Sequence, residues 1–242
     1  MNVIICKNYH EISKKASEIV IDQIKRKPTS VLGLATGSTP LGLYEYLSKA
    51  YQEGKVSFKD VSTFNLDEYI GISHDHPQSY HYYMDQHFFS EIDIKDENTH
   101  LPENDEDCLE ENIEQYNDML KENPIDLQIL GIGSNGHIGF NEPGTPFSNE
   151  TFIAYLDEQT RKDNARFFDS FDEVPKEAIT MGIKNIMKSK KILLLASGEE
   201  KADAIQDMIH GEVTEDLPAS ILQLHPDVTI IIDKQAAKKL SS

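Results

Sequence analysis

Short apolar runs alternate with amphipathic segments along nearly the whole chain. The first run, at 3–6, is followed over 9–27 by apolar residues that recur at helical spacing. Parallel strands need such crossover segments between them, and their sheet is usually covered on both faces. The alternation therefore predicts an α/β fold with a mainly parallel sheet. Further strands are expected at 31–35, 61–66, 127–132, 191–196 and 227–232, with a weaker one at 151–156. Further helices are expected at 41–47, 80–89, 109–120, 174–187 and 200–210, and from the last strand to Ser242. Residues 95–107 are expected to form an irregular acidic connection.

Length and charge limit both the architecture and the partners. The 242 residues contain no repeat, low-complexity tract or linker, so 1–242 is expected to form a single domain. A net charge of −19 argues against nucleic acid and against anionic membranes as partners. No apolar run is long enough to span a bilayer, and the N-terminus lacks a secretory signal. We therefore expect a cytoplasmic protein in which Cys6 and Cys108 are reduced.

A glycine-rich stretch at 131–144, GIGSNGHIGFNEPG, follows the expected strand 127–132 and carries His137 and Glu142. Three of its glycines match the G-x-G-x-x-G spacing of dinucleotide-binding loops, but that motif requires a helix directly after it. The residues FNEPG argue against such a helix. A structural turn remains open as an alternative. The favoured interpretation is a catalytic loop, because ligands of open parallel sheets bind beyond the carboxyl ends of the strands.

A second loop of small and hydroxylated residues follows the expected strand 31–35. It contains Thr36, Gly37, Ser38 and Thr39 and leads into a helix. A helix N-terminus presents free backbone N–H groups and the positive end of the helix dipole to an anion. The Walker pattern is absent, so a nucleoside triphosphate is not indicated. Two hypotheses stay open here: a phosphate site, or a turn whose hydroxyls cap the helix.

A pair of carboxylates, Asp67 and Glu68, follows the expected strand 61–66. Because side chains alternate along extended backbone, the two should point in different directions. Asp67 is the candidate base, and Glu68 is expected to anchor the loop. The H-x-H pair formed by His74 and His76 could suggest a metal, but no further ligand spacing supports one. We therefore predict neither a metal nor a cofactor.

Basic residues complete the set of candidates. Lys201 lies at another junction between strand and helix, and Arg166 lies in the irregular segment that precedes two phenylalanines. Together with the three loops described above, these two basic residues supply an anion-binding site, an isolated carboxylate and a carboxylate beside a histidine. Such a set can carry out general acid and base chemistry on a phosphorylated small molecule.

Five ordered blocks of the sequence resemble one enzyme family, the isomerising glucosamine-6-phosphate deaminases. The blocks are LGLATGSTP, NLDEY, GIGSNGHIGFNEPG, TRKDNARFF and LLLASGEEKA, and they span 32–202. The resemblance implies a three-layer α/β/α sandwich of the Rossmann-like kind. It also implies conversion of D-glucosamine 6-phosphate into D-fructose 6-phosphate and ammonia. By the same resemblance Asp67 is the base at C2, His137 opens the sugar ring with Glu142 as its partner, and phosphate is bound by Thr36, Gly37, Ser38, Thr39, Arg166 and Lys201.

Two departures from the family pattern affect these expectations. Asn135 occupies a position where some members have aspartate, so here it can orient His137 but cannot accept a proton. The stretch 148–159 has no Lys or Arg of the kind that binds an allosteric activator in hexameric members. We therefore expect a monomer or a weak homo-oligomer that acts on a small sugar phosphate without such activation.

Two rival functions share the same fold. A hydrolase similar to 6-phosphogluconolactonase has a comparable Gly-His loop, but NLDEY and the residues NEPG favour the deaminase. A non-catalytic sugar-phosphate sensor would need a DNA-binding segment, and this chain starts directly with its first strand.

Overall fold

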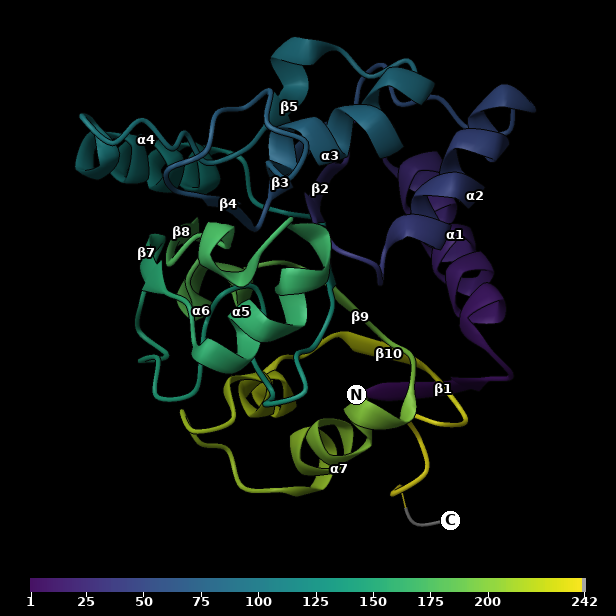
Figure 1. Cartoon of the computed structure of the whole chain (residues 1–242). Helices are drawn as coiled ribbons and strands as arrows, with labels where there is room; N and C mark the ends of the chain where they lie inside the picture. The colour runs from purple at the N-terminus through teal and green to yellow at the C-terminus, as the bar shows by residue number, and fades with distance from the viewer. Residues whose placement is uncertain (241–242) are drawn as a thin grey trace.

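The computed structural model describes the backbone of residues 1–240 and their side chains except those of Asp163 and Phe167. Seven strands form a central sheet in which every neighbouring pair is parallel (Figure 1). Their order across the sheet is β1 (Asn2–Cys6), β10 (Val228–Asp233), β9 (Ile192–Ala196), β6 (Leu127–Leu130), β2 (Val31–Leu34), β3 (Ser62–Asn65) and β5 (Thr99–His100). The strand and helix alternation of the sequence thus produces the predicted mainly parallel α/β sheet.

Helices cover both faces of this sheet. The central strand β9 shows why, because all five of its residues are buried. Leu193 and Leu195 belong to one hydrophobic core, and Ile192 and Leu194 belong to the other. Side chains of a strand point alternately to opposite faces, so each face of β9 must pack against its own layer. This is the three-layer arrangement.

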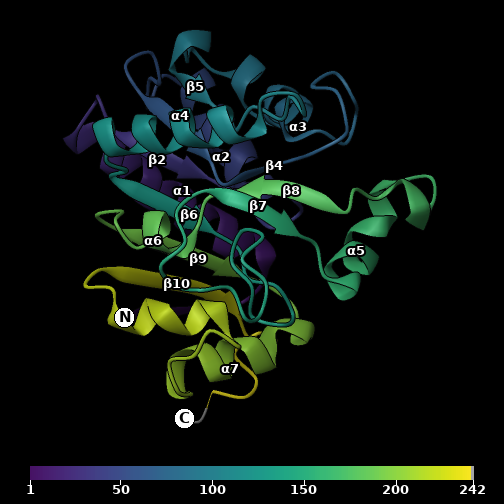
Figure 2. The same cartoon turned by 90° about the vertical axis from the view of Figure 1, so that its left-hand side faces the viewer.

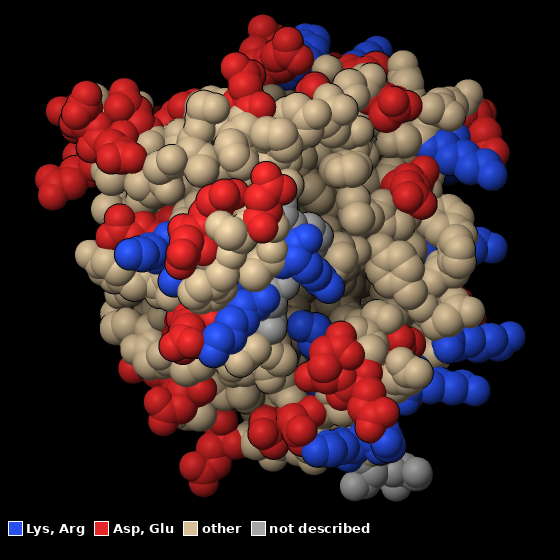
Figure 3. All heavy atoms as spheres, in the orientation of Figure 1, with Lys and Arg blue, Asp and Glu red and all other residues tan. Residues whose placement is uncertain are grey.

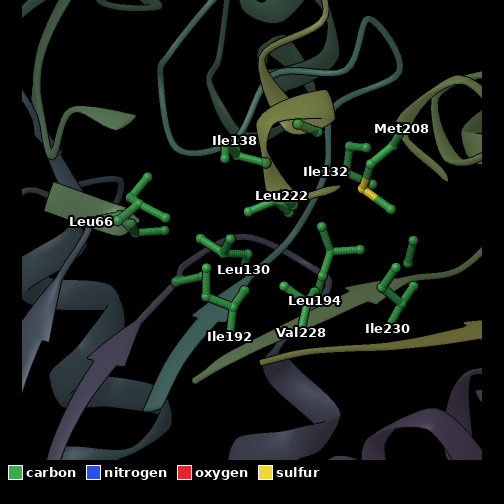
Figure 4. Close-up of a cluster of buried hydrophobic side chains, with 14 of the residues drawn as sticks. Leu66, Leu130, Ile132, Ile138, Ile192, Leu194, Met208, Leu222, Val228 and Ile230 are labelled. Carbon is green, nitrogen blue, oxygen red and sulfur yellow. The ribbon is translucent and has the colours of Figure 1, made fainter. Parts of the chain in front are cut away.

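Each outer layer is built from amphipathic helices. One consists of α1 (Tyr9–Arg26) and α2 (Leu41–Gln52), which pack against each other, with α3 (Tyr80–His87) beside α2. The opposite layer contains α4 (Leu109–Glu122), α7 (Ala202–His210) and the 3-10 helix η6 (Pro218–Leu224). Figure 4 shows Leu130, Leu194 and Ile230 projecting from three strands toward Leu222 and Met208 of that layer.

A second, three-stranded antiparallel sheet lies beside the first and was not expected from the sequence. Its order is β4 (Asp67–Tyr69), β8 (Glu177–Thr180) and β7 (Phe152–Tyr155), seen together in Figure 2. The expected helix at 174–187 is therefore wrong: it is β8 followed by one helical turn, α6 (Ile183–Ile186). Pairing with distant strands gives this segment its extended conformation, because β8 lies between β4 and β7 and buries Ile179 and Thr180 completely.

Smaller differences concern the chain ends and the connections. Residues 234–240 form hydrogen-bonded turns rather than the expected terminal helix, and 241–242 lie outside the described residues. The acidic connection 95–107 contributes the edge strand β5. The remaining short elements are α5 (Glu158–Asn164), η1 (Phe89–Glu91), η2 (Asp96–Asn98), η3 (Ala165–Phe167), η4 (Phe171–Glu173) and η5 (Glu199–Lys201). Within residues 1–240, no helix has both the length and the apolar character needed to cross a membrane.

Gly182 separates β8 from α6 at a point where no side chain fits. A Cβ atom there would lie 2.2 Å from the backbone oxygens of Asn149 and Glu150. We expect Gly182→Ala to reduce the free energy of unfolding by about 1–3 kcal/mol, because the backbone must shift to make room. Denaturant unfolding of both proteins measures the change. Gly131→Ala is the control, since its methyl group would make only ordinary contact with Thr39 at 3.7 Å; equal destabilisation by both substitutions would contradict the steric explanation.

Candidate active site

A cavity of about 170 Å³ opens beyond the carboxyl ends of the central strands. It collects residues from six separate parts of the sequence. The predicted residues that line it are Thr36, Gly37, Ser38, Thr39, Asp67, His137, Arg166 and Lys201. In Figure 3, Lys and Arg side chains gather around a hollow near the centre of a face that otherwise carries many acidic side chains. Asn135 and Glu142 do not line the cavity but contact His137 behind it.

The loop between β2 and α2 forms one wall of the cavity. Gly37 has a φ of +85°, and its carbonyl oxygen accepts a hydrogen bond of 2.6 Å from the Tyr83 hydroxyl. The carbonyl oxygen of Ser38 accepts one of 2.9 Å from the Tyr9 hydroxyl. Because the two tyrosine hydroxyls bind the carbonyl groups of Gly37 and Ser38, the loop can present its backbone N–H groups to the cavity. The N-cap residue of α2, Pro40, makes no side-chain hydrogen bond, and the Gly42 N–H of the first turn donates to the Tyr9 hydroxyl over 2.8 Å, so the hypothesis that Ser38 or Thr39 caps this helix is not supported.

Basic side chains reach the same wall from far along the chain. Arg166 of η3 donates from Nη2 to the Ser38 hydroxyl over 3.3 Å. Lys201 comes from η5, directly after β9. The loop, the α2 N-terminus and two cations make this wall suitable for a phosphate group.

Asp67 begins β4 and is only 5% exposed. Burial, with a smaller contribution from the charge of neighbouring Glu68, raises the pKa of Asp67 to about 8. The glycine-rich loop passes closely beside it at Gly139, which has a φ of +56°; a Cβ there would lie only 3.1 Å from Thr180 Oγ1, with Asp67 Oδ2 at 3.5 Å. A carboxyl group in such surroundings is a strong base once ionised.

Glu68 points away from the cavity and anchors the following loop, as its position suggested. Its buried carboxylate accepts hydrogen bonds from the backbone N–H groups of Tyr69, Tyr80 and His81, at 2.8, 3.0 and 3.0 Å. His81 Nδ1 lies 2.8 Å from the same carboxylate. Glu68 therefore fixes the start of α3 and with it Tyr80, whose ring lines the cavity.

His137, Asn135 and Glu142 form a relay whose hydrogen bonds determine the histidine tautomer. Asn135 Nδ2 donates to Glu142 Oε2 over 3.0 Å, so its Oδ1 faces His137 Nδ1 at 2.7 Å. An amide oxygen only accepts, hence Nδ1 carries the proton and Nε2 carries the lone pair. The His137 ring packs directly on Gly133, where a Cβ would come within 2.3 Å of ring atoms.

Within this relay, Glu142 is the charged member. Burial opposes its ionisation, but hydrogen bonds with His137, Thr160 and Asn135 outweigh burial and hold the pKa of Glu142 below its usual range. Its Oε2 lies 3.4 Å from His137 Nδ1. Glu142 is thus an ionised carboxylate that stabilises positive charge on the imidazole.

Sequence reasoning missed Thr160 as a site residue. Thr160 lies on α5, is 3% exposed, and places its hydroxyl 3.5 Å from His137 Nδ1. Asn164, one turn later, donates to the Tyr69 hydroxyl over 3.1 Å and also lines the cavity. The signal was in TRKDNARFF, where Thr160 and Asn164 are four residues apart and so share one helix face.

The chain matches a family model described as glucosamine-6-phosphate isomerases/6-phosphogluconolactonase over residues 7–231. It belongs to this family. Among its relatives, a glucosamine-6-phosphate deaminase of Thermoanaerobacter pseudethanolicus is 58% identical, over 98% of this chain and 94% of that protein. A deaminase of the same name from Clostridium botulinum (strain Alaska E43) is 51% identical over the whole chain and 97% of that protein.

Solved structures within the family agree with the fold. A monomeric glucosamine-6-phosphate deaminase superposes with a TM-score of 0.96 at 50% identity, covering 98% of this chain and 99% of that one. The 6-phosphogluconolactonase of Trypanosoma brucei reaches a TM-score of 0.81 at 17% identity, over 99% and 98%. The second likeness concerns the fold alone.

Proposed function

We propose that this protein converts D-glucosamine 6-phosphate into D-fructose 6-phosphate and ammonia by general acid and base catalysis, without a cofactor. One observation carries the proposal: a buried carboxylate, Asp67, and an imidazole of fixed tautomer, His137, line one cavity with a cationic wall. The relatives at 50–58% identity, all named deaminases, support it.

Phosphate binding is the first role. The loop of Thr36, Gly37, Ser38 and Thr39, with Arg166 and Lys201, holds the 6-phosphate at the cationic wall. Each charge-assisted hydrogen bond contributes about 1.5–3 kcal/mol. Three or four of them offset the repulsion between the anionic substrate and a protein of net charge −19.

Ring opening is the second role. Nε2 of His137 takes the proton of the anomeric hydroxyl and delivers a proton to the ring oxygen. During this transfer the imidazole is transiently charged. Glu142 stabilises that charge, while Asn135 holds the Nδ1–H tautomer.

Proton transfer between carbons is the third role. Asp67 removes the proton from C2 of the open-chain amino sugar and returns a proton to C1. A proton also passes from the amino nitrogen to the aldehyde oxygen, so C1 becomes a primary alcohol and C2 becomes an imine. Water adds to C2, and the nitrogen leaves as ammonia. The buried position of Asp67 makes its carboxylate basic enough for this step.

The decisive assay incubates the protein with glucosamine 6-phosphate and measures both ammonia and fructose 6-phosphate. We expect the two products in equal amounts. Hydrolysis of 6-phosphogluconolactone without ammonia release from the amino sugar would support the lactonase alternative instead. Binding of glucosamine 6-phosphate without turnover would support the sensor. Gel filtration with light scattering tests the further proposal that the protein is a monomer or a weak homo-oligomer.

Arg166→Ala is expected to raise KM for glucosamine 6-phosphate about 10- to 100-fold with a smaller change in kcat. The reason is the loss of one charge-assisted bond to the phosphate, worth about 1.5–3 kcal/mol. Steady-state kinetics checks this. Lys162→Ala is the matched control, since Lys162 carries the same charge on neighbouring α5 but pairs with Glu158 at 2.6 Å; an equal rise in KM for both variants would indicate a general charge effect.

Thr160→Val is expected to lower kcat about fivefold with little change in KM. Valine has nearly the same shape but lacks the hydroxyl that contacts Glu142 and His137, and a hydrogen bond contributes about 1 kcal/mol. Thr160→Ser keeps the hydroxyl and should retain most of the activity. If serine and valine variants lose activity equally, Thr160 acts through packing rather than through the relay.

A further inference from the structure

Three side chains outside the cavity come together above the start of α3. His74 lies in the loop that follows β4, His81 is the second residue of α3, and Glu103 follows β5. One potential ligand atom from each lies within 4.8 Å of the others. His74 Nε2 and Glu103 Oε2 are 3.5 Å apart. Two ligands at about 2.0–2.1 Å from one tetrahedral zinc ion are separated by roughly 3.3 Å, so this pair already has the required spacing.

The buried Glu68 gives His81 the tautomer that binds metals. Glu68 accepts backbone N–H bonds from Tyr80 and His81 as well as the contact with His81 Nδ1 at 2.8 Å. An acceptor of this kind keeps the proton on Nδ1 and leaves the lone pair on Nε2. Histidines that ligate metals have this same second partner, a carboxylate on the other ring nitrogen.

The imidazole rings of His74 and His81 lie face to face. Their rings stack with centroids 3.6 Å apart and planes at 13°. The stacked rings do not yet aim at one point. To bind an ion together with His81, the ring of His74, whose side chain is 39% exposed, would turn about its Cβ–Cγ bond.

Further acidic residues lie close to the cluster along the chain. Asp75 lies next to His74 in the loop, and Asp105 and Glu106 follow Glu103 closely in sequence. Glu106 Oε1 reaches to 3.6 Å from the position of a Cβ on Gly71, in the same loop as His74. A local excess of negative charge raises the concentration of divalent cations at this surface.

We propose that His74, His81 and Glu103 form a binding site for a divalent transition metal ion of the zinc class, with Glu68 as the partner that orients His81. Imidazole and carboxylate ligands suit such ions, and water completes the coordination. The ion would connect three segments: the loop after β4, the start of α3 and the stretch after β5. It thereby stabilises the loop that Glu68 anchors, without contacting substrate.

Titration of the intact protein with ZnCl2 by calorimetry tests the site. We expect one ion per chain with micromolar affinity and a rise in melting temperature on addition of Zn²⁺, because the ion binds only the folded chain. Co²⁺ as a second probe should give the visible absorption of a low-symmetry site.

Three variants decide the assignment. His74→Ala and the surface change Glu103→Gln should each weaken Zn²⁺ binding tenfold or more. His76→Gln is the matched control, because His76 belongs to the same loop but accepts a hydrogen bond from the backbone N–H of Gln78 at 3.1 Å and lies outside the cluster. Unchanged binding in the first two variants, or an equal loss in the His76 variant, would overturn the proposal. Glu103 is exposed, so its variant tests the site without endangering the fold.

Discussion

Asp67→Asn is expected to lower kcat about a thousandfold while leaving the affinity for the sugar phosphate nearly unchanged. Asparagine keeps the size of the side chain but cannot accept the proton from C2, and a general base contributes about 10²- to 10⁴-fold. The cationic wall that holds the phosphate is untouched by the change. Ammonia release measures the rate, and equilibrium binding of glucosamine 6-phosphate measures the affinity. A variant that keeps a tenth of the activity would show that another group takes the proton.

The pH dependence of stability provides an independent check on this variant. The pKa of Asp67 is raised to about 8, so between about pH 4 and pH 8 the folded state binds more protons than the unfolded state. The contribution of Asp67 to the free energy of unfolding is therefore fully present below the ordinary aspartate pKa of about 4, and it is lost as the pH rises toward 8. An asparagine side chain has no proton to lose, so the Asp67→Asn protein should become the more stable one by about 1 kcal/mol or more at pH 8. Urea unfolding at pH 5 and pH 8 measures the difference, and an advantage that shrinks with rising pH would contradict the assigned pKa.

The middle of the central sheet was predictable because strands β6 and β9 are completely buried. The run 192–196 is apolar throughout, which is typical of a strand covered on both faces. The segment at 174–187 was not predictable in the same way. Its strand β8 has four residues, and its partners β4 and β7 lie far away in sequence. Local periodicity contains no information about such partners, so the helical interpretation failed there.

The candidate site was predictable where a residue follows a strand. Asp67, His137 and the loop at 36–39 come after strands that end at one edge of the sheet, and the structure places them around one cavity. Thr160 could not be found by that rule, since α5 belongs to a segment that only tertiary contacts bring over His137. The pairing of His74 with His81 was missed for a similar reason: the sequence suggested His76 as the partner, but the turn into α3 stacks His81 on His74.

His137→Gln is expected to lower kcat/KM about a hundredfold and to change what limits the reaction. Glutamine cannot move a proton between the anomeric hydroxyl and the ring oxygen, but Asp67 still acts on sugar that opens spontaneously. The initial rate should therefore stop increasing with enzyme concentration once non-enzymatic ring opening limits the supply of open chain. The wild-type rate stays proportional to enzyme over the same range. Initial rates at increasing enzyme concentration, measured by ammonia release, distinguish these two cases.

Substitutions at Asn135 test, in the same assay, whether ring opening depends on the His137 tautomer or on the charge of Glu142. Asn135→Asp keeps an oxygen that accepts the His137 Nδ1–H bond and should retain ring opening, although it places a second carboxylate beside Glu142 at the 3.0 Å contact. Asn135→Leu removes that acceptor, frees the imidazole to take the other tautomer, and should approach the behaviour of His137→Gln. If the leucine variant stays proportional to enzyme concentration with an unchanged kcat, the amide does not control the tautomer, and Glu142 alone orients the ring.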